Sequence, residues 1–228
     1  MKTKAIFLSL VLLLGGLSLK AQSPFNFGEK QTKQKAVSVS LGVGAGANMS
    51  GLVGVTTSDP SMKEMLIGAN AGLLFQIRFL PRNNRSGAES GILAIQPEVR
   101  FSMQGGKSQG KQLGLTYLSI PVMIQVYPTA GLYLEVGPVV NLNIGHSPDD
   151  ITLDGKGYNL TGLKANDFMV AAGIGYLFDF GLGIGVRYNH GLMPLDPNLP
   201  MRNYCIQAGL SYLLRLGKKP AAERSFDF

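Results

Sequence analysis

The chain has 228 residues, of which 45% are hydrophobic and 15% are charged, so it is long enough for one domain with a full core and too weakly charged for a disordered protein. Its single cysteine, Cys205, excludes an internal disulfide and cannot form a zinc site alone. The formal net charge of +7 falls to +4 if Lys2, Lys4 and Lys20 are removed with a leader, because 18 of the 21 basic residues then remain together with 14 acidic residues. The basic residues are scattered and form no nucleic-acid-binding motif, so we expect no nucleic acid partner.

The first segment has the pattern of a secretory signal peptide, which we predict over residues 1–21. Lys2 and Lys4 precede an apolar run, and small residues before Gln22 predict cleavage after Ala21. A transmembrane helix is the alternative, but the run is shorter than the roughly 20 apolar residues that span a bilayer and is interrupted by glycines. Residues 22–36 are polar and are expected to form a flexible periplasmic lead-in.

Eight segments follow in which apolar and polar residues alternate with the period of two that is typical of β-strands. In the first, every odd position from Val37 to Met49 is apolar and every even one is Ser, Gly or Asn. A helical period would scatter the glycines and serines around the whole circumference, so the fold class is all-β. The predicted strands cover residues 37–49, 67–79, 95–103, 116–127, 132–144, 167–178, 182–192 and 204–214.

The two faces of these segments differ in charge. A soluble sandwich buries its apolar face, whereas a membrane barrel turns that face to lipid and its polar face inward. Segments of about 11 residues at a tilt near 40° span about 28 Å, close to the apolar band of an outer-membrane barrel. We therefore predict an eight-stranded antiparallel up-and-down transmembrane β-barrel over residues 37–216. The charged residues of its polar face, expected in the lumen, are Arg78, Glu98, Arg100, Glu135, Asp167 and Arg187.

The connections between the predicted strands support this architecture. The first, third, fifth and seventh are long and polar, whereas the fourth and sixth are tight turns at residues 128–130 and 179–181. Only the second, about residues 80–90, is longer than expected on the side of the short turns. Long loops on one side and short turns on the other are typical of outer-membrane barrels. We therefore expect the loops outside the cell and both termini, with a tail at residues 217–228, in the periplasm.

The last predicted strand contains an assembly pattern. Gln207, Gly209, Tyr212 and Leu214 resemble the polar-x-Gly-x-x-aromatic-x-apolar signal that the barrel assembly machinery reads in bacterial outer-membrane proteins. Here the match is followed by a basic tail, so it is not terminal. An ordinary strand that contains a glycine is the alternative. The pattern predicts that the barrel assembly machinery is a partner.

Six short motifs occur in a fixed order along the chain. They are residues 46–50, 96–101 followed by Gly105 and Gly106, 117–121, 135–138, 167–168 and 187–191. In this order they resemble the PorT-like outer-membrane β-barrel family of the Bacteroidetes, over roughly residues 37–216. The resemblance implies the fold and the location. Some members of that family serve protein export by the type IX secretion pathway, and most have no assigned activity, so the resemblance implies no mechanism.

The six charged residues of the polar face are expected to meet inside the barrel. Three arginines and three carboxylates sum to zero, and an eight-stranded barrel is about wide enough for side chains to fill it. Buried charges must be paired, so we expect a polar, mostly filled interior with a closed ion-paired network. A narrow gated pathway is the alternative. Aromatic residues near the short turns fit an interface girdle, and they are Phe75, Phe79, Tyr127, Tyr133, Phe178, Phe180 and Tyr212.

The sequence contains little catalytic or metal-binding chemistry. His146, beside Ser147, and His190 are expected at outer strand ends, where a lipid deacylase would need them, but they match no recognised motif. The spacing of four oxygen-bearing side chains in the longest loop fits no EF-hand, so we expect a solvated loop. These four are Asp149, Asp150, Asp154 and Asn159. We predict no enzymatic activity, no catalytic residue, no cofactor and no metal site.

The sequence thus predicts an outer-membrane barrel, surrounded by outer-membrane lipid, with a structural or interaction role. The family resemblance points to protein secretion or envelope assembly. A partner would engage the outer loops, the 80–90 connection or the tail, whose basic residues are Arg82, Arg85, Lys218, Lys219 and Arg224. A small porin or transport barrel is the main alternative. A soluble lipocalin-like carrier and an outer-membrane lipid-modifying enzyme rank below it.

Overall fold

The computed structural model describes residues 37–56, 59–79, 93–129, 131–153, 156–160, 163–196 and 200–216. The predicted signal peptide, the lead-in, the 80–90 connection and the C-terminal tail lie outside these ranges. Within them, no helix has the length and hydropathy needed to cross a membrane.

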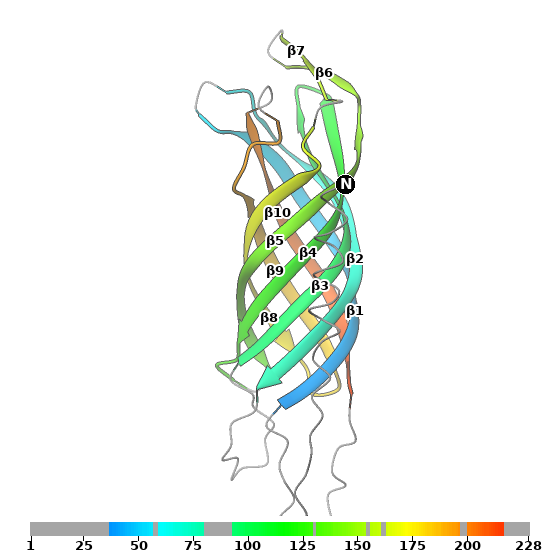
Figure 1. The fold of residues 1–228 in the computed structure, drawn as a ribbon, viewed down its shortest axis with the longest axis vertical. Helices are drawn as coiled ribbons and strands as arrows, with labels where there is room; N and C mark the ends of the chain where they lie inside the picture. Colours follow the sequence, from blue (N-terminus) through cyan, green and yellow to red (C-terminus); the bar gives the residue numbers. More distant parts are fainter. Residues whose placement is uncertain are drawn as a thin grey trace, which may run out of the picture. The chain divides into compact units, whose positions relative to one another are not determined.

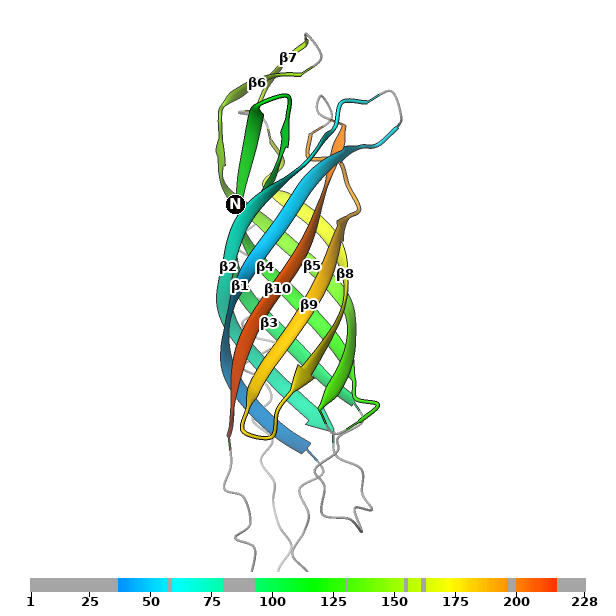
Figure 2. The same ribbon diagram turned by 180° about the vertical axis from the view of Figure 1, so that it is seen from behind.

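Eight long strands in the described ranges close into an antiparallel barrel in the order β1-β10-β9-β8-β5-β4-β3-β2 (Figure 1). Figure 2 shows β1 beside β10 on the opposite side, where the first and last strands pair and close the ring. A separate two-stranded hairpin, β6 and β7, lies between β5 and β8 in the chain. The predicted eight-stranded, up-and-down, all-β fold is confirmed. The bounds are β1 Val37–Gly54, β2 Met62–Phe79, β3 Leu93–Ser108, β4 Lys111–Val126, β5 Leu132–Ser147, β6 Asp150–Leu153, β7 Lys156–Asn159, β8 Asn166–Leu177, β9 Leu182–Gly191 and β10 Met201–Arg215.

Along most of each strand, polar side chains point into the barrel and apolar side chains point outward. On β3, Glu98 is 2% exposed, whereas its neighbour Val99 is 49% exposed. On β9, Arg187 is 9% exposed between Val186 at 49% and Tyr188 at 45%. An outward apolar face is favourable in lipid and unfavourable in water. The predicted orientation, with the charges inside, is therefore confirmed.

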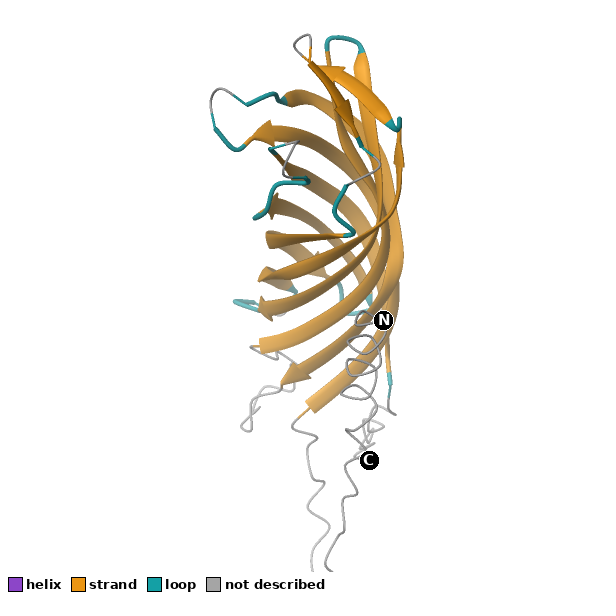
Figure 3. Cartoon of the chain, turned by 45° about the horizontal axis from the view of Figure 1, so that its top comes forward, coloured by secondary structure: helices purple, strands orange, loops and turns teal. Residues whose placement is uncertain are grey.

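Six of the eight barrel strands extend beyond their predicted bounds at one end, whereas β8 and β9 end within one residue of theirs. We call this end the loop end, where β1 is joined to β2 and β3 to β4, and it comes forward in Figure 3. The opposite turn end is where β1 begins and β10 ends. At the loop end the alternation reverses, because Leu113 and Leu115 on β4 are buried while Gln112 is exposed. These six predicted strands were too short because they followed the outward apolar face, which stops where the strands leave the lipid.

The inward apolar side chains at the loop end form a buried cluster, which we call the apolar cap. Its members are at most 6% exposed. The hairpin of β6 and β7 pairs only with itself, and Lys111 Nζ donates a hydrogen bond of 2.5 Å to the carbonyl oxygen of Thr152 on it. The prediction of a polar interior is therefore wrong at this end, because outside the lipid the strands must bury apolar surface inward. The members are Leu52, Met62, Leu113, Leu115, Tyr117 and Met201 from barrel strands, and Ile151, Leu153, Leu160 and Leu195 from connecting segments.

Candidate functional site

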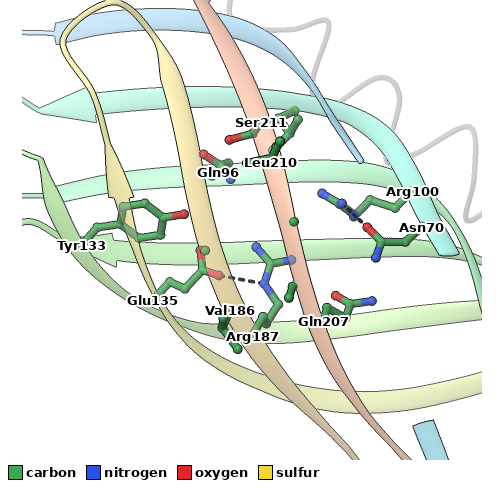
Figure 4. Close-up of a pocket in the computed structure, with 14 residues that line it drawn as sticks. Asn70, Gln96, Arg100, Tyr133, Glu135, Val186, Arg187, Gln207, Leu210 and Ser211 are labelled. Atoms are coloured by element: carbon green, nitrogen blue, oxygen red, sulfur yellow. Dashed lines mark hydrogen bonds and ion pairs between the residues drawn. The ribbon is translucent and has the colours of Figure 1, made fainter. Parts of the chain in front are cut away.

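Four of the six charged residues predicted for the lumen form one buried cluster. Arg187 on β9 holds Glu98 on β3 in a fork, with Nη1 3.1 Å from Oε2 and Nη2 2.8 Å from Oε1. Arg187 Nε also donates to Glu135 Oε1 on β5 at 2.7 Å. Arg100 Nη1 donates to Glu98 Oε2 at 3.2 Å. Figure 4 shows Arg187 and Glu135 bonded to each other beside the same cavity as Arg100. Each charge in the cluster thus has an opposite partner, and the four sum to zero.

The fork crosses the barrel interior, because β3 and β9 are not neighbours in the ring. Its two residues are 89 positions apart in the chain. Both side chains are buried, and Glu98 is the more enclosed of the two. Because an eight-stranded barrel is only wide enough for its own side chains, a bidentate pair across it obstructs the lumen.

Glycines on the inner faces of β8 and β9 make room for these long side chains. A Cβ at Gly173 would come within 2.9 Å of Glu135 Oε1, and one at Gly185 within 2.9 Å of Tyr133 Oη. Such contacts are too short for a real side chain. The abundance of glycine in these strands therefore has a packing reason, since the narrow interior has no space for two side chains at facing positions.

Toward the turn end, the charge cluster continues through amide side chains. Gln96 Nε2 donates to Glu98 Oε1 at 2.9 Å, and Gln125 Nε2 donates to Glu135 Oε2 at 3.0 Å. Gln76 Nε2 lies 3.1 Å from Gln96 Oε1 and 2.9 Å from Gln125 Oε1, so it connects the two. No role was predicted for these glutamines. They occupy the same inward positions in the alternation as the charges, which is the signal that identifies them.

Arg78 lies at the turn end and not in the charge cluster. Its guanidinium carbon is 3.7 Å from the ring centroid of Tyr127, in a cation–π contact. Tyr127 in turn donates from Oη to Gln125 Oε1 at 2.9 Å. Tyr127 and Tyr133 occupy inward positions, with ring centroids 5.6 Å apart, so their prediction as members of a lipid-interface girdle is wrong. Phe180, another predicted member, is 65% exposed.

Toward the loop end, hydrogen bonds continue from Arg100 through uncharged side chains. Arg100 Nη2 donates to Asn70, and Asn48 Nδ2 donates to Ser102 Oγ at 3.0 Å. The series of hydrogen bonds ends at Asn203, whose Nδ2 donates to Gln104 Oε1 at 2.7 Å. We call the whole linked series, from the turn end to Asn203, the polar file. Its members beyond Arg100 are, in order, Asn70, Asn48, Ser102, Gln104 and Asn203.

Asp167 is the sixth charge predicted for the lumen, and it too lies outside the charge cluster. It is 4% exposed and points inward near the loop end of β8. In the strand register it is paired with Asn141 on β5, which is paired with Ser119 on β4. Arg78 and Asp167 are therefore separated toward opposite ends of the barrel, because their strands place them several register rows from the cluster.

The residues of the predicted assembly pattern divide between the two faces of β10. Gln207 and Gly209 occupy inward positions, and a Cβ at Gly209 would lie 2.7 Å from the carbonyl oxygen of Ala45. Tyr212 and Leu214 point outward and are 44% and 59% exposed. Two outward apolar side chains at the turn end are available to a membrane or a protein. Recognition by the barrel assembly machinery stays a prediction.

The two histidines are not brought together. His146 Nε2 on β5 is 3.6 Å from Asp149 Oδ1, whereas His190 Nδ1 on β9 is 3.1 Å from Tyr188 Oη. The strand β8 separates β5 from β9 in the ring. Neither histidine therefore has the serine and carboxylate arrangement of a hydrolytic triad within the described residues.

Two of the four oxygen-bearing side chains of the longest loop are bonded to each other within the hairpin. Asn159 Nδ2 donates to Asp150 Oδ1 at 2.9 Å across the paired strands β6 and β7. Asp154 lies outside the described residues. In the part of the chain that the structure describes, no three His, Cys, Asp or Glu side chains are grouped closely enough to hold a metal ion.

Two cavities border the polar file. One of about 60 Å³, drawn in Figure 4, lies beside Arg100, Glu135 and Arg187. A second of about 160 Å³ lies at the turn end beside Arg78 and Asp179. Small-molecule sites typically enclose about 300–1,000 Å³, so these cavities suit water or small ions.

Comparison with known proteins supports the barrel assignment at the level of family. The sequence matches the outer membrane protein beta-barrel domain family over residues 21–196. None of the curated proteins compared with the chain matches it significantly.

Solved structures with similar folds include Ail, the attachment invasion locus protein of Yersinia pestis, at 12% identity and a TM-score of 0.44, covering 77% of this chain and 98% of that one. Neisserial surface protein A has 14% identity and a TM-score of 0.46, with 75% of this chain and 96% of that chain covered. The family match spans more than half of the chain, and this protein belongs to the outer membrane protein beta-barrel domain family.

Proposed function

We propose that this protein is an outer membrane barrel without a steady conductance, whose role is structural or depends on a binding partner. The observation that carries the proposal is the fork between Arg187 and Glu98, which joins opposite parts of the barrel wall across the lumen. Removing one partner of a buried ion pair is strongly destabilising, so thermal opening of the fork is rare. The apolar cap adds a second barrier, since apolar constrictions exclude water and ions.

Current recordings in planar bilayers test the closed lumen. The purified protein should give no stable current steps, and heat-modifiable migration on a gel should show that the same sample is folded. Large channels of a defined size would replace this proposal with a small porin or transport barrel.

We place the loop end outside the cell and both chain termini in the periplasm. Three of the four connections at the loop end are longer than the turns at residues 127–131 and 178–181, and this supports the orientation, although β3 and β4, predicted to have a long connection, are joined by residues 109–110 alone. The reversed alternation at the loop end, where strands continue past the lipid, also supports it.

Variants with a single added cysteine, Gly157→Cys in the hairpin or Thr129→Cys in a short turn, test this orientation. The native Cys205 is 0% exposed, so only the added cysteine should be labelled. A membrane-impermeant maleimide should label the first variant in intact cells and the second only after permeabilisation. The opposite pattern would reverse the orientation.

We propose an envelope or secretion protein as the partner. The resemblance to PorT-like barrels supports this, together with the basic residues of the 80–90 connection and the tail, which lie outside the described residues. Mild crosslinking in cells followed by purification should recover a partner with the wild type. A variant with Arg82, Arg85, Lys218, Lys219 and Arg224 changed to Ser should lose it. A barrel that is solitary in both preparations would contradict the proposal.

The proposal includes no enzymatic activity and no cofactor. The separation of His146 and His190 onto non-neighbouring strands supports this part of it. The mass spectrum of lipid A should be the same from cells that express the wild type, the His146→Ala variant or no protein. A mass change that requires His146 would support a lipid-modifying enzyme instead.

A further inference from the structure

A group of buried oxygen atoms lies between the polar file and the apolar cap. Ser119 on β4, Asn141 on β5 and Asp167 on β8 occupy paired positions on three neighbouring strands and point inward. They are 4%, 0% and 4% exposed. The side chain of Asn141 lies beside the carboxylate of Asp167. Three strands thus direct oxygen-bearing side chains into one part of the lumen.

Two further side chains reach the same region from other positions. Tyr117, a member of the apolar cap, lies near Asp167, and Asn203, the last member of the polar file, lies beside the Tyr117 hydroxyl. Both are buried. Six oxygen atoms of the five side chains make no hydrogen bond of standard geometry within the described residues, although the Asn141 side chain and the backbone amide of Phe168 lie close to the Asp167 carboxylate. The six oxygens are Tyr117 Oη, Ser119 Oγ, Asn141 Oδ1, Asp167 Oδ1, Asp167 Oδ2 and Asn203 Oδ1.

The charge of Asp167 has no ion-pair partner among the described residues. Lys164 is the cation that acts on it from the adjoining connection, but Lys164 Nζ is exposed and donates to the carbonyl oxygen of Pro194 at 3.2 Å. The arginines of the charge cluster are already balanced by Glu98 and Glu135. Buried charges in proteins are paired or bind metal ions, because an isolated buried carboxylate is very costly.

A proton on Asp167 does not satisfy this group of oxygens. The protonated carboxyl and the hydroxyls of Tyr117 and Ser119 then donate three hydrogen bonds, which is fewer than the acceptor oxygens that the five side chains present. A hard cation instead contacts several oxygens at once. A single carboxylate among neutral oxygens balances one positive charge, and buried sites favour neutrality. We propose that these side chains bind a monovalent metal cation, Na⁺ or K⁺, in the lumen beneath the apolar cap.

No metal site was predicted from the sequence, so this cation site is an addition to the predicted features of the protein. It does not depend on the identity of a partner. A cation held by β4, β5, β8 and β10 joins strands from different parts of the ring. It therefore couples the stability of the loop end to the concentration of the cation, because a ligand that binds only the folded state stabilises it by mass action.

Thermal unfolding of the full chain in detergent micelles tests the site. The protein is refolded separately in choline chloride, NaCl, KCl or CaCl₂ at equal ionic strength, so that the cation can enter before the apolar cap forms, and heat-modifiable migration is then followed. Na⁺ or K⁺ should raise the unfolding temperature of the wild type by several degrees with a saturating dose response. A response to Ca²⁺ alone would contradict the charge argument, and no saturable response to any cation would overturn the site.

Three variants separate binding from general salt effects. Asp167→Asn keeps the shape but removes the charge, and it should fold and lose the response. Ser119→Ala removes one oxygen and should shift the half-saturating concentration at least severalfold upward, whereas screening alone predicts no shift. Asp149→Asn changes a carboxylate whose side chain is 78% exposed, and it should respond like the wild type.

Two direct measurements complete the test. Crystals grown with Rb⁺ or Tl⁺ should show an anomalous peak among the oxygens of Asp167, Asn141 and Ser119, and none in Asp167→Asn. Infrared difference spectra between the wild type and Asp167→Asn should contain no band from a protonated carboxylic acid. Such a band in the presence of Na⁺ and K⁺ would show that a proton neutralises Asp167, and would overturn the proposal.

Discussion

Arg187 and Glu98 form a forked ion pair between β9 and β3, two strands that do not pair with each other in the barrel. Glu135 also binds Arg187 and has no other charged partner in the described cluster, whereas Glu98 has Arg100 as a second one. The two carboxylates are therefore not equivalent, and this asymmetry makes the ion pairs separable by mutation.

The first prediction concerns this asymmetry. Arg187→Met should lower the free energy of unfolding by about 3–5 kcal/mol, because it leaves buried negative charge without its partner. The double variant with Glu135→Gln leaves only the balanced pair of Arg100 and Glu98, so it should be more stable than Arg187→Met alone. Urea titrations in lipid vesicles measure both. Additive losses from the two changes would show that Glu135 does not depend on Arg187 for its charge balance.

The second prediction concerns the two barriers in the lumen. Replacing residues 150–159 with a short glycine linker removes the hairpin from the apolar cap but leaves the fork between Arg187 and Glu98. This variant should remain silent in planar bilayers. Removing the hairpin together with Arg187→Ala, Glu98→Ala and Glu135→Ala both thins the apolar cap and removes the ion pairs of the charge cluster, and it should give measurable current. Current from the hairpin deletion alone would show that the charge cluster does not close the lumen.

The third prediction compares two glycines with positive φ at the β3–β4 hairpin. Gly105 has φ +137°, and a Cβ there would collide with the carbonyl oxygen of Leu113, whereas Gly110 has φ +74° and open space around it. Gly110→Ala should cost only about 1 kcal/mol for the backbone conformation. Gly105→Ala should cost several-fold more or prevent folding, because the paired strands must separate. Unfolding in urea and the yield of folded barrel distinguish the two, and equal losses would contradict the pairing of Gly105 with Gly114 on β4.

The fourth prediction tests where the strands leave the lipid. Val136 on β5 is 51% exposed on the apolar band, while Gln112 on β4 is exposed beyond the reversal of the alternation. Val136→Arg should destabilise the barrel in vesicles by about 2–4 kcal/mol, and Gln112→Arg by less than about 1 kcal/mol. In detergent, where the apolar layer is thinner and more adaptable, the difference should shrink. Equal costs in vesicles would place both positions in the same environment.

The fifth prediction concerns assembly in the cell. Tyr212 is an outward residue of the predicted assembly pattern and is 44% exposed, close to the 45% of Tyr188, which lies outside that pattern. Tyr212→Ala should reduce the amount of folded protein in the outer membrane severalfold, while the purified variant refolds in detergent as well as Tyr188→Ala does. If both variants assemble equally well in cells, the pattern is an ordinary strand sequence.

Much of the fold followed from the alternation of residues. The stretch from Ile95 to Met103 carries apolar residues on one face and Glu98 and Arg100 on the other, and the structure places these faces outward and inward as expected. Lipid imposes a strict condition on every outward position, so each strand carries this signal independently of its neighbours. The same condition made six of the predicted strands too short, because it applies only within the membrane.

Only the tertiary structure decided which inward residues meet. The alternation placed Arg78, Asp167 and the four residues of the charge cluster on the inner face, but partners such as Arg187 and Glu98 are 89 residues apart and depend on strand tilt and register. The apolar cap likewise required the fold, because Leu195 and the hairpin come from connections whose patterns carry no period. The sequence by itself determined which face each strand turns to lipid, since that choice is local. The interior was decided by packing around a closed ring, since every contact across it joins distant parts of the chain.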